Sequence, residues 1–450
     1  MTELRALSPG KLGHGFSDDG LQRAFESNPD YVGIDAGSTD MGPFYMGTET
    51  SFFHEISIKR DLQALLRPCL TRKIPLVIGS AVTIGTKRHL AMALRWLDDV
   101  ARNEGITCRV AVVQTEQEKS FVKSQLRAGR IRTLGAFAPL DEESIDASKV
   151  IVAQIGVEPL LAALDTEADI VLAGRCCDDA IFAAPAVRRG YDQGLALHMG
   201  KIMECASMCS IPPDLHGPMI GRLGADNFVL EPPEPHRRCT VQSVAAHALY
   251  ERENPYRQAG PGGVNDLSEC TFTQVSERAV RVSGSRWVRS QEYAVKLEGV
   301  RHAGYRCICL GGARDPQFIA QVDSVLAGAR ADAASRFRDH EEEFALFFKL
   351  YGRDAVMGDT EPDRRPGHEL GVFIEVIGKT QELADAVCMY VRGTIQHAGY
   401  PGQVATAGNL AYPFAPVCIP TGEVYRFHID HLMVLDDPLE CVQVTVETVG

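Results

Sequence analysis

Polar residues follow three short apolar runs in the first half of the chain. The runs lie in YVGIDAGSTD (31–40), PLVIGSA (75–81) and DIVLAGRCCDDA (169–180). Each run stops at a glycine, and polar side chains then lead into a helix-like segment. Open parallel sheets bind ligands at the carboxyl ends of their strands, where loop backbone and helix N-termini meet. We therefore expect the three segments to form one site.

Several residues of these segments are candidates for binding a substrate or a metal ion. An arginine directly after a strand can hold a carboxylate or phosphate through two hydrogen bonds, which makes Arg175 the candidate for the substrate's anionic group. An ion pair with Asp178 or Asp179 is the alternative for Arg175, and capping of a helix is the simpler explanation of each aspartate. The other candidate substrate contacts here are Ser38, Thr39, Gly79 and Ser80. The candidate oxygen ligands of a divalent cation such as Mg²⁺ are Asp35, Asp40 and Asp178.

Two residues of opposite charge, Lys201 and Glu204, lie three positions apart in LHMGKIMECASMC (197–209). On a helix they share one face with His198, and the residues around them are largely apolar. A solvated polar stripe is the alternative. If the stripe is buried, the low dielectric can shift a Lys or Glu toward acid–base work near neutral pH. Lys201 and Glu204 are therefore the candidate catalytic residues.

Two later stretches are expected to reach the same cleft. KLEGVRHAGYR (296–306) carries Lys296 and Glu298 on one face of a predicted strand, where an ordinary ion pair is the alternative. TAGNLAYPF (406–414) offers Asn409 as a candidate substrate contact, although Asn and Gly also build turns.

The pattern of strands and helices predicts the fold class. From residue 31 to about 190, strands that are apolar on both faces alternate with helices, which is typical of a doubly wound α/β domain with a mainly parallel sheet. In this domain KVIVAQIG (149–156) is one of the strands, and Pro68 breaks or ends the helix that begins near residue 59.

The remaining chain is expected to differ in character. Residues 211–300 are rich in Pro and Gly and predict an irregular connecting region with a short hairpin in TFTQV and AVRVSGS. Residues 301–450 read as β-α-β-β-α-β, the order of a ferredoxin-like α+β domain. The first domain then spans residues 1–210.

Composition excludes several classes of partner. The net charge of −13 argues against binding to nucleic acid or anionic lipid, and the sequence has no apolar run long enough to span a membrane. An apolar signal core is also missing from the first residues, so we expect a cytoplasmic protein. The 13 cysteines form no CxxC pair and are expected to be buried thiols. We also expect a homo-oligomer, because symmetric homo-oligomers are common among soluble enzymes.

Nucleotide-binding motifs are weak or missing. GIDAGST (33–39) is similar to the phosphate-binding turn of the actin and sugar-kinase fold, but DMGPFYMGTETS follows it where that fold needs a second strand. The sequence contains no GxGxxG dinucleotide motif, no GxxxxGK[ST] loop and no GxSxG elbow.

Four segments taken together resemble the acyclic terpene utilisation AtuA family. They are YVGIDAGSTDMGPFYMG (31–47), VLAGRCCDDAIFAA (171–184), HMGKIMECASM (198–208) and TAGNLAYPF (406–414), with support from KLEGVRHAGYR and PGGVNDLSE (261–269). The resemblance implies a cytoplasmic catabolic protein and a small companion protein of ferredoxin-like type. It implies no particular reaction for these positions.

The leading hypothesis is a lyase or hydratase acting on a hydroxylated or unsaturated carboxylic acid or its CoA thioester. Arg175 would hold a carboxylate, and Lys201 or Glu204 would move a proton beside the carbonyl. Backbone N–H groups near Gly37–Ser38 and Gly79–Ser80 would stabilise the enolate. This chemistry needs no redox cofactor.

Two alternatives remain open. The chain could be a non-catalytic subunit that binds an acyl ligand and works with the companion protein, or an NTP-dependent enzyme that uses the DAGST turn. Strand-end residues that converge would favour catalysis, whereas separated and solvated ones would favour the binding subunit.

Overall fold

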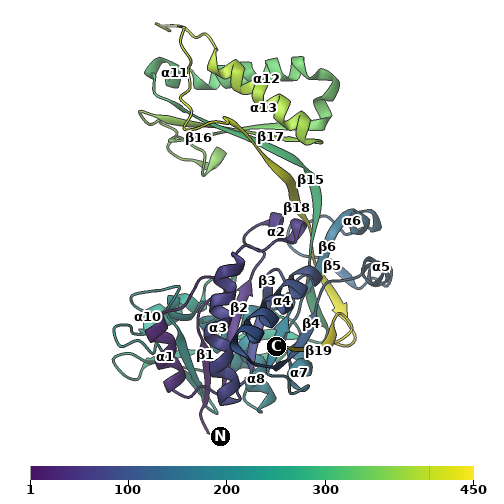
Figure 1. Ribbon diagram of the computed structural model, residues 1–450, viewed down its shortest axis with the longest axis vertical. Coiled ribbons are helices and arrows are strands. Elements are labelled where there is room, and N and C mark those ends of the chain that lie inside the picture. The colour runs from purple at the N-terminus through teal and green to yellow at the C-terminus, as the bar shows by residue number, and fades with distance from the viewer. Residues whose placement is uncertain (1, 405) are drawn as a thin grey trace. The chain divides into compact units, whose positions relative to one another are not determined.

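The computed structural model describes residues 2–404 and 406–450, and the chain forms two compact units (Figure 1). Unit 1 contains the chain up to Arg301 together with Phe427–Gly450, and unit 2 is His302–Arg426. Unit 2 is thus inserted between two parts of unit 1. The segments 211–300 and 427–450 belong to unit 1, which differs from the three consecutive domains expected from the sequence.

Ten strands of unit 1 form a mixed sheet in the order β12-β13-β9-β8-β1-β2-β3-β7-β4-β19. Their bounds are β1 Leu4–Ser8, β2 Tyr31–Gly37, β3 Leu76–Thr83, β4 Cys108–Gln114, β7 Ile170–Ala173, β8 Met219–Leu223, β9 Asn227–Glu231, β12 Thr271–Gln274, β13 Val280–Ser283 and β19 Gln443–Val449. The strands β1, β2, β3, β7 and β4 pair in parallel, and the outer strands pair antiparallel. The parallel centre is the part of the sheet that the sequence predicted.

Helices cover both faces of this parallel centre. One face packs against α1 (Asp18–Glu26), α3 (Glu55–Arg72) and α4 (Lys87–Glu104), and the other against α7 (Val157–Leu164), α8 (Asp178–Arg188) and α9 (Gln193–Met203). Alternate strand residues serve the two cores: Val77 belongs to one, and Leu76 and Ile78 belong to the other. Burial on both faces explains why these strands are continuously apolar. The predicted α/β class is therefore confirmed.

Three local expectations for unit 1 are wrong. Helix α3 runs through Pro68, because its buried residues Leu62, Leu65, Leu66 and Cys69 hold it against the core on both sides of the proline. The segment 149–156 is mainly strand β6 (Ser148–Gln154), but it pairs antiparallel with β15 (Tyr293–Ala313) and not with the parallel strands. An apolar run predicts a buried strand without naming its sheet. Residues 211–300 also supply β8, β9, β12 and β13 of the main sheet.

The smaller elements of unit 1 complete its surface. The expected hairpin is present as the antiparallel pair β12–β13. A second sheet has the order β10-β11-β14, with β10 Arg257–Gly260, β11 Gly263–Asp266 and β14 Arg286–Arg289. The remaining elements are α2 Pro43–Thr48, α5 Lys119–Arg127, β5 Ile131–Thr133, α6 Glu142–Ala147, the 3₁₀ helix η1 Ala206–Cys209 and α10 Val241–Ala248.

Unit 2 packs helices on one face of an antiparallel sheet. The sheet has the order β16-β17-β15-β18-β5, of which β15 and β18 continue into unit 1 and β5 belongs wholly to unit 1. The bounds are α11 Pro316–Ala320, α12 Val322–Arg336, η2 Arg338–Glu343, β16 Phe344–Tyr351, η3 Gly358–Thr360, β17 Leu370–Gly378, α13 Gln381–Gln396 and β18 Cys418–Leu435. Alternate residues of β17 are buried against α12 and α13 in one core. The carboxylate of Asp315 accepts from the backbone N–H groups of Gln317 and Phe318 and so caps the start of α11.

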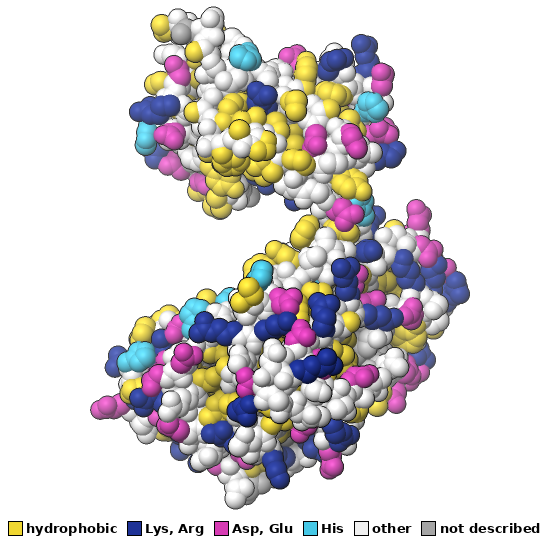
Figure 2. All heavy atoms as spheres, viewed as in Figure 1, with side chains coloured by type: hydrophobic (Ala, Val, Ile, Leu, Met, Phe, Trp, Pro, Cys, Tyr) yellow, Lys and Arg dark blue, Asp and Glu magenta, His cyan; other side chains and the backbone are white. Residues whose placement is uncertain are grey.

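Basic and acidic side chains are interspersed on the face shown in Figure 2. In the part of the chain that the structure describes, no helix is both long and apolar enough to cross a membrane.

Candidate functional site

The three glycine-ended strands predicted from the sequence meet at their carboxyl ends. A Cβ atom on Gly37, at the end of β2, would lie 2.0 Å from the carbonyl oxygen of Thr83 at the end of β3. A Cβ atom on Gly85 would lie 2.5 Å from the backbone of Gly174, just beyond β7. Only glycine allows backbones to approach this closely. The expectation of one shared edge is therefore confirmed.

The backbone at the carboxyl end of β3 adopts a conformation that side chains disfavour. Ser80, Val82 and Thr83 have φ angles of 49°, 51° and 86°. Such left-handed conformations in residues other than glycine cost about 1–3 kcal/mol each and occur preferentially at functional sites. The strain is held in place by the surrounding contacts, among them the hydrogen bond from the Phe52 N–H to Thr83 Oγ1 at 2.8 Å.

Arg175 is held by a carboxylate of the protein itself. Its Nε donates to Glu298 Oε2 on β15 at 2.7 Å, and both side chains are almost completely buried. Ser80 Oγ and Thr39 Oγ1 also accept from its guanidinium, at 3.3 and 3.5 Å. The expectation that Arg175 binds a substrate carboxylate is therefore not supported. Of the predicted alternative partners, Asp178 lies 3.9 Å away.

Glu298 joins Arg175 to a second cation. Lys296 Nζ lies 3.0 Å from Glu298 Oε1, and Thr39 Oγ1 donates to the same oxygen at 3.0 Å. Burial alone would raise the pKa of Glu298, but Arg175 and Lys296 outweigh burial and lower it to about 2. Glu298 thus stays ionised, and this side of the site is a fixed network of charges. It confirms the predicted link between segment 296–306 and the strand ends.

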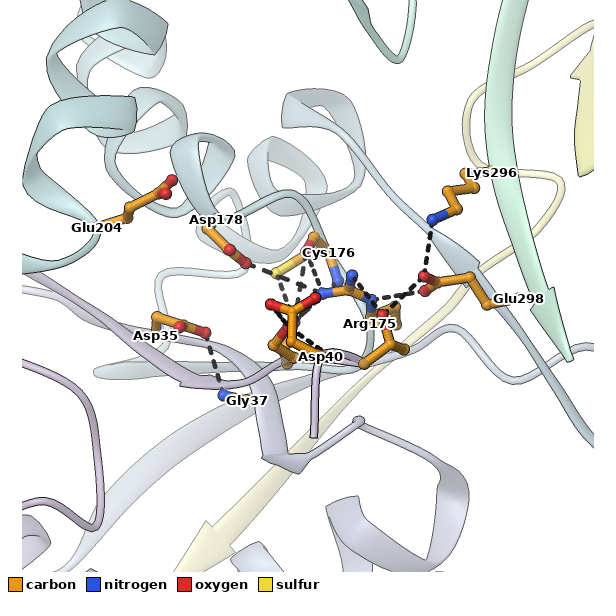
Figure 3. Close-up of polar contacts among 12 residues, drawn as sticks. Asp35, Gly37, Asp40, Arg175, Cys176, Asp178, Glu204, Lys296 and Glu298 are labelled. Atoms are coloured by element: carbon orange, nitrogen blue, oxygen red, sulfur yellow. Dashed lines mark hydrogen bonds and ion pairs between the residues drawn. The ribbon is translucent and has the colours of Figure 1, made fainter. Parts of the chain in front are cut away.

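Three further carboxyl groups, those of Asp35, Asp178 and Glu204, lie on the opposite side of Arg175 from Glu298, as Figure 3 shows. Asp35, inside β2, is 1% exposed, and its carboxylate lies 3.4 Å from Lys11 Nζ. Burial raises the pKa of Asp35, while Lys11 opposes that rise. For Lys11, burial alone would lower the pKa, but Asp35 and the other acidic groups raise it overall. Lys11 therefore remains a cation beside the cluster.

Asp178 is the first residue of α8 and is poised to hold a proton. Burial raises its pKa well above the ordinary value, and the nearby carboxylates of Asp35 and Glu204 raise it further. Among the described residues, its buried Oδ1 atom has no hydrogen-bond partner. The side chain is 23% exposed, so solvent or a ligand can reach it. It makes no capping hydrogen bond to α8, whereas the neighbouring Asp179 pairs with Arg252 at 3.2 Å.

Lys201 and Glu204 lie together at the end of α9, as their spacing predicted. Lys201 Nζ donates to Glu204 Oε1 at 2.5 Å, and both side chains are 4% exposed. Burial raises the pKa of Glu204 to about 7; Lys201 opposes the rise and Asp179 adds to it. The ammonium also lies over the ring of Tyr250, 5.2 Å from its centre. Glu204 can thus gain or lose a proton near neutral pH.

The DAGST turn is built by its own hydrogen bonds. Ser38 Oγ donates to Asp40 Oδ2 at 2.5 Å and accepts from the Asp40 N–H at 3.1 Å. Helix α2 follows at Pro43, so the hairpin of the actin and sugar-kinase fold is not formed here.

The predicted metal ligands Asp35, Asp40 and Asp178 do not form a coordination set. In residues 2–404 and 406–450, no three or more His, Cys, Asp or Glu side chains are arranged to hold a metal ion. The buried Asp35 carboxylate is paired with Lys11, and the Asp40 carboxylate accepts from Ser38.

Three other predicted residues have structural roles. Gly79 packs against Ile181 and Cys176, and Ser80 helps to position Arg175. Asn409 belongs to unit 2, where its amide donates to the carbonyls of Ile395 and Ala398 at the end of α13. Its expected role in binding substrate is therefore not supported. His198 is fully buried beside Ser285, 2.8 Å from its hydroxyl, and does not join the Lys201–Glu204 pair.

Sequence reasoning missed Lys11. It lies in the loop after β1. The Leu12 N–H in this loop donates to the backbone carbonyl of Asp35, and this bond holds Lys11 next to Asp35. The only signal was a lysine among glycines and a proline in SPGKLGHG (8–15), a turn-like segment near the N-terminus.

The arrangement supports proton transfer, because carboxyl groups with raised pKa values lie beside two lysines at the strand ends, where Asp178 and Lys11 are partly exposed to solvent. No curated protein and no solved structure gives a significant match to the chain. The model of the acyclic terpene utilisation family protein AtuA matches residues 46–211 and 225–425. Those residues include Arg175, Asp178, Lys201, Glu204 and Glu298. Since the match covers well over half of the sequence, this chain belongs to the AtuA family, which is linked to acyclic terpene utilisation.

Proposed function

We propose that this chain is a catabolic lyase or hydratase that acts on a hydroxylated or unsaturated carboxylic acid or on its CoA thioester. The observation that carries the proposal is a pair of carboxyl groups with raised pKa values, the partly buried Asp178 and the buried Glu204. Reversible loss of water beside a carbonyl needs one group that takes a proton and one that gives a proton. A pair of carboxyl groups that titrate at different pH values can supply both.

Each carboxyl group has a defined task in the proposed reaction. In the direction of elimination, the Glu204 carboxylate takes the proton from the carbon next to the carbonyl. The protonated Asp178 gives its proton to the departing hydroxyl group, which leaves as water. In hydration the same two groups exchange protons in the reverse order. A pKa of about 7 suits Glu204 to this work, because both its protonation states are then available near neutral pH.

Lysine side chains replace backbone amides as the groups that stabilise the enolate. The N–H of Gly37 donates to Asp35 Oδ1, and the N–H of Ser80 donates to the carbonyl of Gly174. These amides are therefore engaged within the protein. Lys11 lies beside Asp35 and Lys201 beside Glu204, and a cation in a partly buried site stabilises a developing oxyanion. The buried ion pair of Arg175 and Glu298 lies beside these residues and has a structural role.

The convergence of buried charged groups favours catalysis over the non-catalytic acyl-binding subunit. A surface that only binds an acyl group gains nothing from two carboxyl groups whose surroundings raise their pKa values, because such groups cost folding free energy.

The test is water exchange measured by mass spectrometry. Purified protein is incubated in H₂¹⁸O with a panel of 3-hydroxy and 2,3-unsaturated acids and their CoA thioesters. We expect water addition or loss with at least one member, and a rate that falls as Glu204 becomes protonated below pH 7.

The variant Glu204→Gln should slow this reaction by at least about 100-fold, since general acid–base groups contribute 10²–10⁴-fold. Glu277→Gln, which changes an exposed carboxylate in the same way, is the matched control. A panel in which no compound exchanges water, or a Glu204→Gln variant as fast as the control, would overturn the assignment.

We further propose that unit 2 is of ferredoxin-like type. Its order of elements is β-α-β-β-α-β, from β15 through α12, β16, β17 and α13 to β18. The four strands lie in the order β16-β17-β15-β18 with the helices in one shared core, which supports this type. A small companion protein stays a prediction.

A further inference from the structure

Four cysteines of unit 2 lie close together, although they are far apart in the sequence. Cys307 and Cys309 belong to β15, Cys388 to α13, and Cys418 is the first residue of β18. Cys307, Cys309 and Cys388 are fully buried in the core between sheet and helices, and Cys418 is half-buried against the same core. All four are free thiols. The proposed lyase chemistry uses none of them.

Cys418 is the thiol of this cluster that solvent can reach. Strands β15 and β18 are neighbours in the sheet, and Gly299 lies against Ile429 while Arg306 lies against Thr421. The two strands therefore run antiparallel, and Cys418 lies across from Cys309, with Cys388 and the guanidinium of Arg392 also nearby. The two neighbouring thiols, together with Arg392, lower the pKa of Cys418 below its ordinary value. The Cys388 thiol in turn neighbours Cys307. A partly exposed thiol beside a cation and two further thiols has the surroundings of a reactive cysteine.

Two other cysteines provide a comparison within the same chain. Cys177 and Cys270 are, with Cys418, the described cysteines that are neither fully buried nor fully exposed. Burial raises the pKa of each of these two thiols. Exposure therefore does not distinguish Cys418 from Cys177 and Cys270. The thiols and the guanidinium that surround Cys418 distinguish it.

We infer that Cys418 is an oxidation site, at which a peroxide converts the thiolate to a sulfenic acid that Cys388 or Cys309 then resolves to a disulfide. In the first step the Cys418 sulfur attacks one peroxide oxygen, the O–O bond breaks, and hydroxide leaves and takes up a proton. The sulfur loses two electrons to the peroxide. In the second step the sulfur of the neighbouring thiol, which gives up its proton, attacks Cys418. The S–O bond breaks, and the oxygen leaves as water.

The inference is independent of the proposed lyase activity, because all the residues involved belong to unit 2. It assigns a second chemistry to the chain, and it identifies hydrogen peroxide or an organic hydroperoxide as the co-reactant.

Peptide mapping of the wild-type protein tests the inference directly. The full chain is treated with limiting hydrogen peroxide, with and without dimedone, which traps sulfenic acids, and is then digested without reduction. We expect Cys418 to be oxidised at least about tenfold faster than Cys177 and Cys270, because an ordinary thiol is only a few per cent thiolate at pH 7. Without dimedone, the Cys418 peptide should be disulfide-linked to the peptide of Cys388 or Cys309.

Two variants separate the steps. Cys418→Ser should lose both the dimedone adduct and the disulfide in unit 2, while Cys177 and Cys270 react as before. Cys309→Ala combined with Cys388→Ala should form no disulfide and should retain the trapped sulfenic acid at Cys418. Equal reactivity of Cys418, Cys177 and Cys270 in the wild-type digest would overturn the inference, as would Cys418 oxidation without a disulfide to either neighbour. The wild-type digest decides the matter even if the double variant does not fold.

Discussion

At the scale of single residues, the site divides into a fixed half and a titrating half. Glu298 is surrounded by Arg175, Lys296 and the hydroxyl of Thr39, so its charge is compensated and its pKa is low. Asp178 has weaker compensation, and its neighbours include the carboxylates of Asp35 and Glu204. Proton transfer belongs to the second half, and the first half holds the strand ends in place.

The Glu298→Gln variant should destabilise the fold strongly, because it leaves Arg175 buried without a full counter-charge. Breaking one partner of a buried ion pair costs about 3–5 kcal/mol. Since the folded-state pKa of Glu298 is about 2 and the reference value is 4.5, its stabilisation is present above pH 4.5 and is lost as the pH falls toward 2. Urea unfolding at pH 7 and pH 3.5 should therefore show a smaller difference from wild type at the lower pH.

Glu292→Gln is the matched control for this prediction. Glu292 pairs with Arg132 at 2.8 Å, but both side chains are more than half exposed. Exposed pairs contribute about 0–1 kcal/mol. If the two variants lose the same stability, the Arg175–Glu298 pair is not the anchor described here.

The Asp178→Asn variant should trade activity for stability. The raised pKa of Asp178 means that the folded chain binds this proton more tightly than the unfolded chain does. Wild-type stability therefore falls as the pH rises above 3.8 and through the folded-state pKa, and asparagine removes that loss.

Melting temperatures from pH 4 to pH 8 measure this effect for Asp178→Asn. The variant should gain on wild type as the pH rises, and the proposed water exchange should slow by about 100-fold. A difference in melting temperature that does not change with pH would contradict the raised pKa.

At the scale of elements, the site depends on turns that let strand ends touch. Gly37→Ala places a methyl group 2.0 Å from the Thr83 carbonyl oxygen, and backbone on both sides prevents relief. We expect a loss of about 3 kcal/mol or more, measured by urea unfolding.

Gly393→Ala serves as the control for the glycine substitution. Gly393 lies inside α13, and a Cβ atom there meets nothing within 4 Å. Alanine in a helix interior should stabilise by about 0.5–1 kcal/mol. A tolerated Gly37→Ala would show that the ends of β2 and β3 do not need this close approach.

These turns were also the most predictable part of the structure. An apolar run that ends at Gly37, Gly79 or Gly174 carries its own local signal, so the shared edge of the sheet could be placed from the sequence. The spacing of Lys201 and Glu204 on one helix face was local information of the same kind, and the pair is confirmed.

Contacts between distant segments could not be predicted in the same way. Arg175 and Glu298 are 123 positions apart in the sequence. Both were predicted to lie at the cleft, but their ion pair was not predicted. Lys11 reaches Asp35 through a loop that has no periodicity. Strand β6 shows the same limit, because burial predicts a strand but its partner β15 follows about 140 residues later.

At the scale of the whole molecule, unit 2 is inserted into the chain of unit 1, and the candidate site lies entirely within unit 1. Asp35, Asp178, Glu204, Arg175 and Glu298 all belong to unit 1. Cys418, proposed to react with peroxide, and the thiols proposed to form the disulfide with it all belong to unit 2. The two proposed chemistries can therefore be tested separately in the intact chain.

The central claim is that Glu204 moves a proton at the carbon next to a substrate carbonyl. The most direct measurement is the uptake of deuterium at that carbon in D₂O, followed by mass spectrometry for the acids and CoA thioesters described above. Wild type and Glu277→Gln should exchange at the same rate, and Glu204→Gln should be slower by at least about 100-fold at a temperature at which all three proteins are folded. Exchange by Glu204→Gln at the wild-type rate, or no exchange by wild type with any member of the panel, would contradict the account.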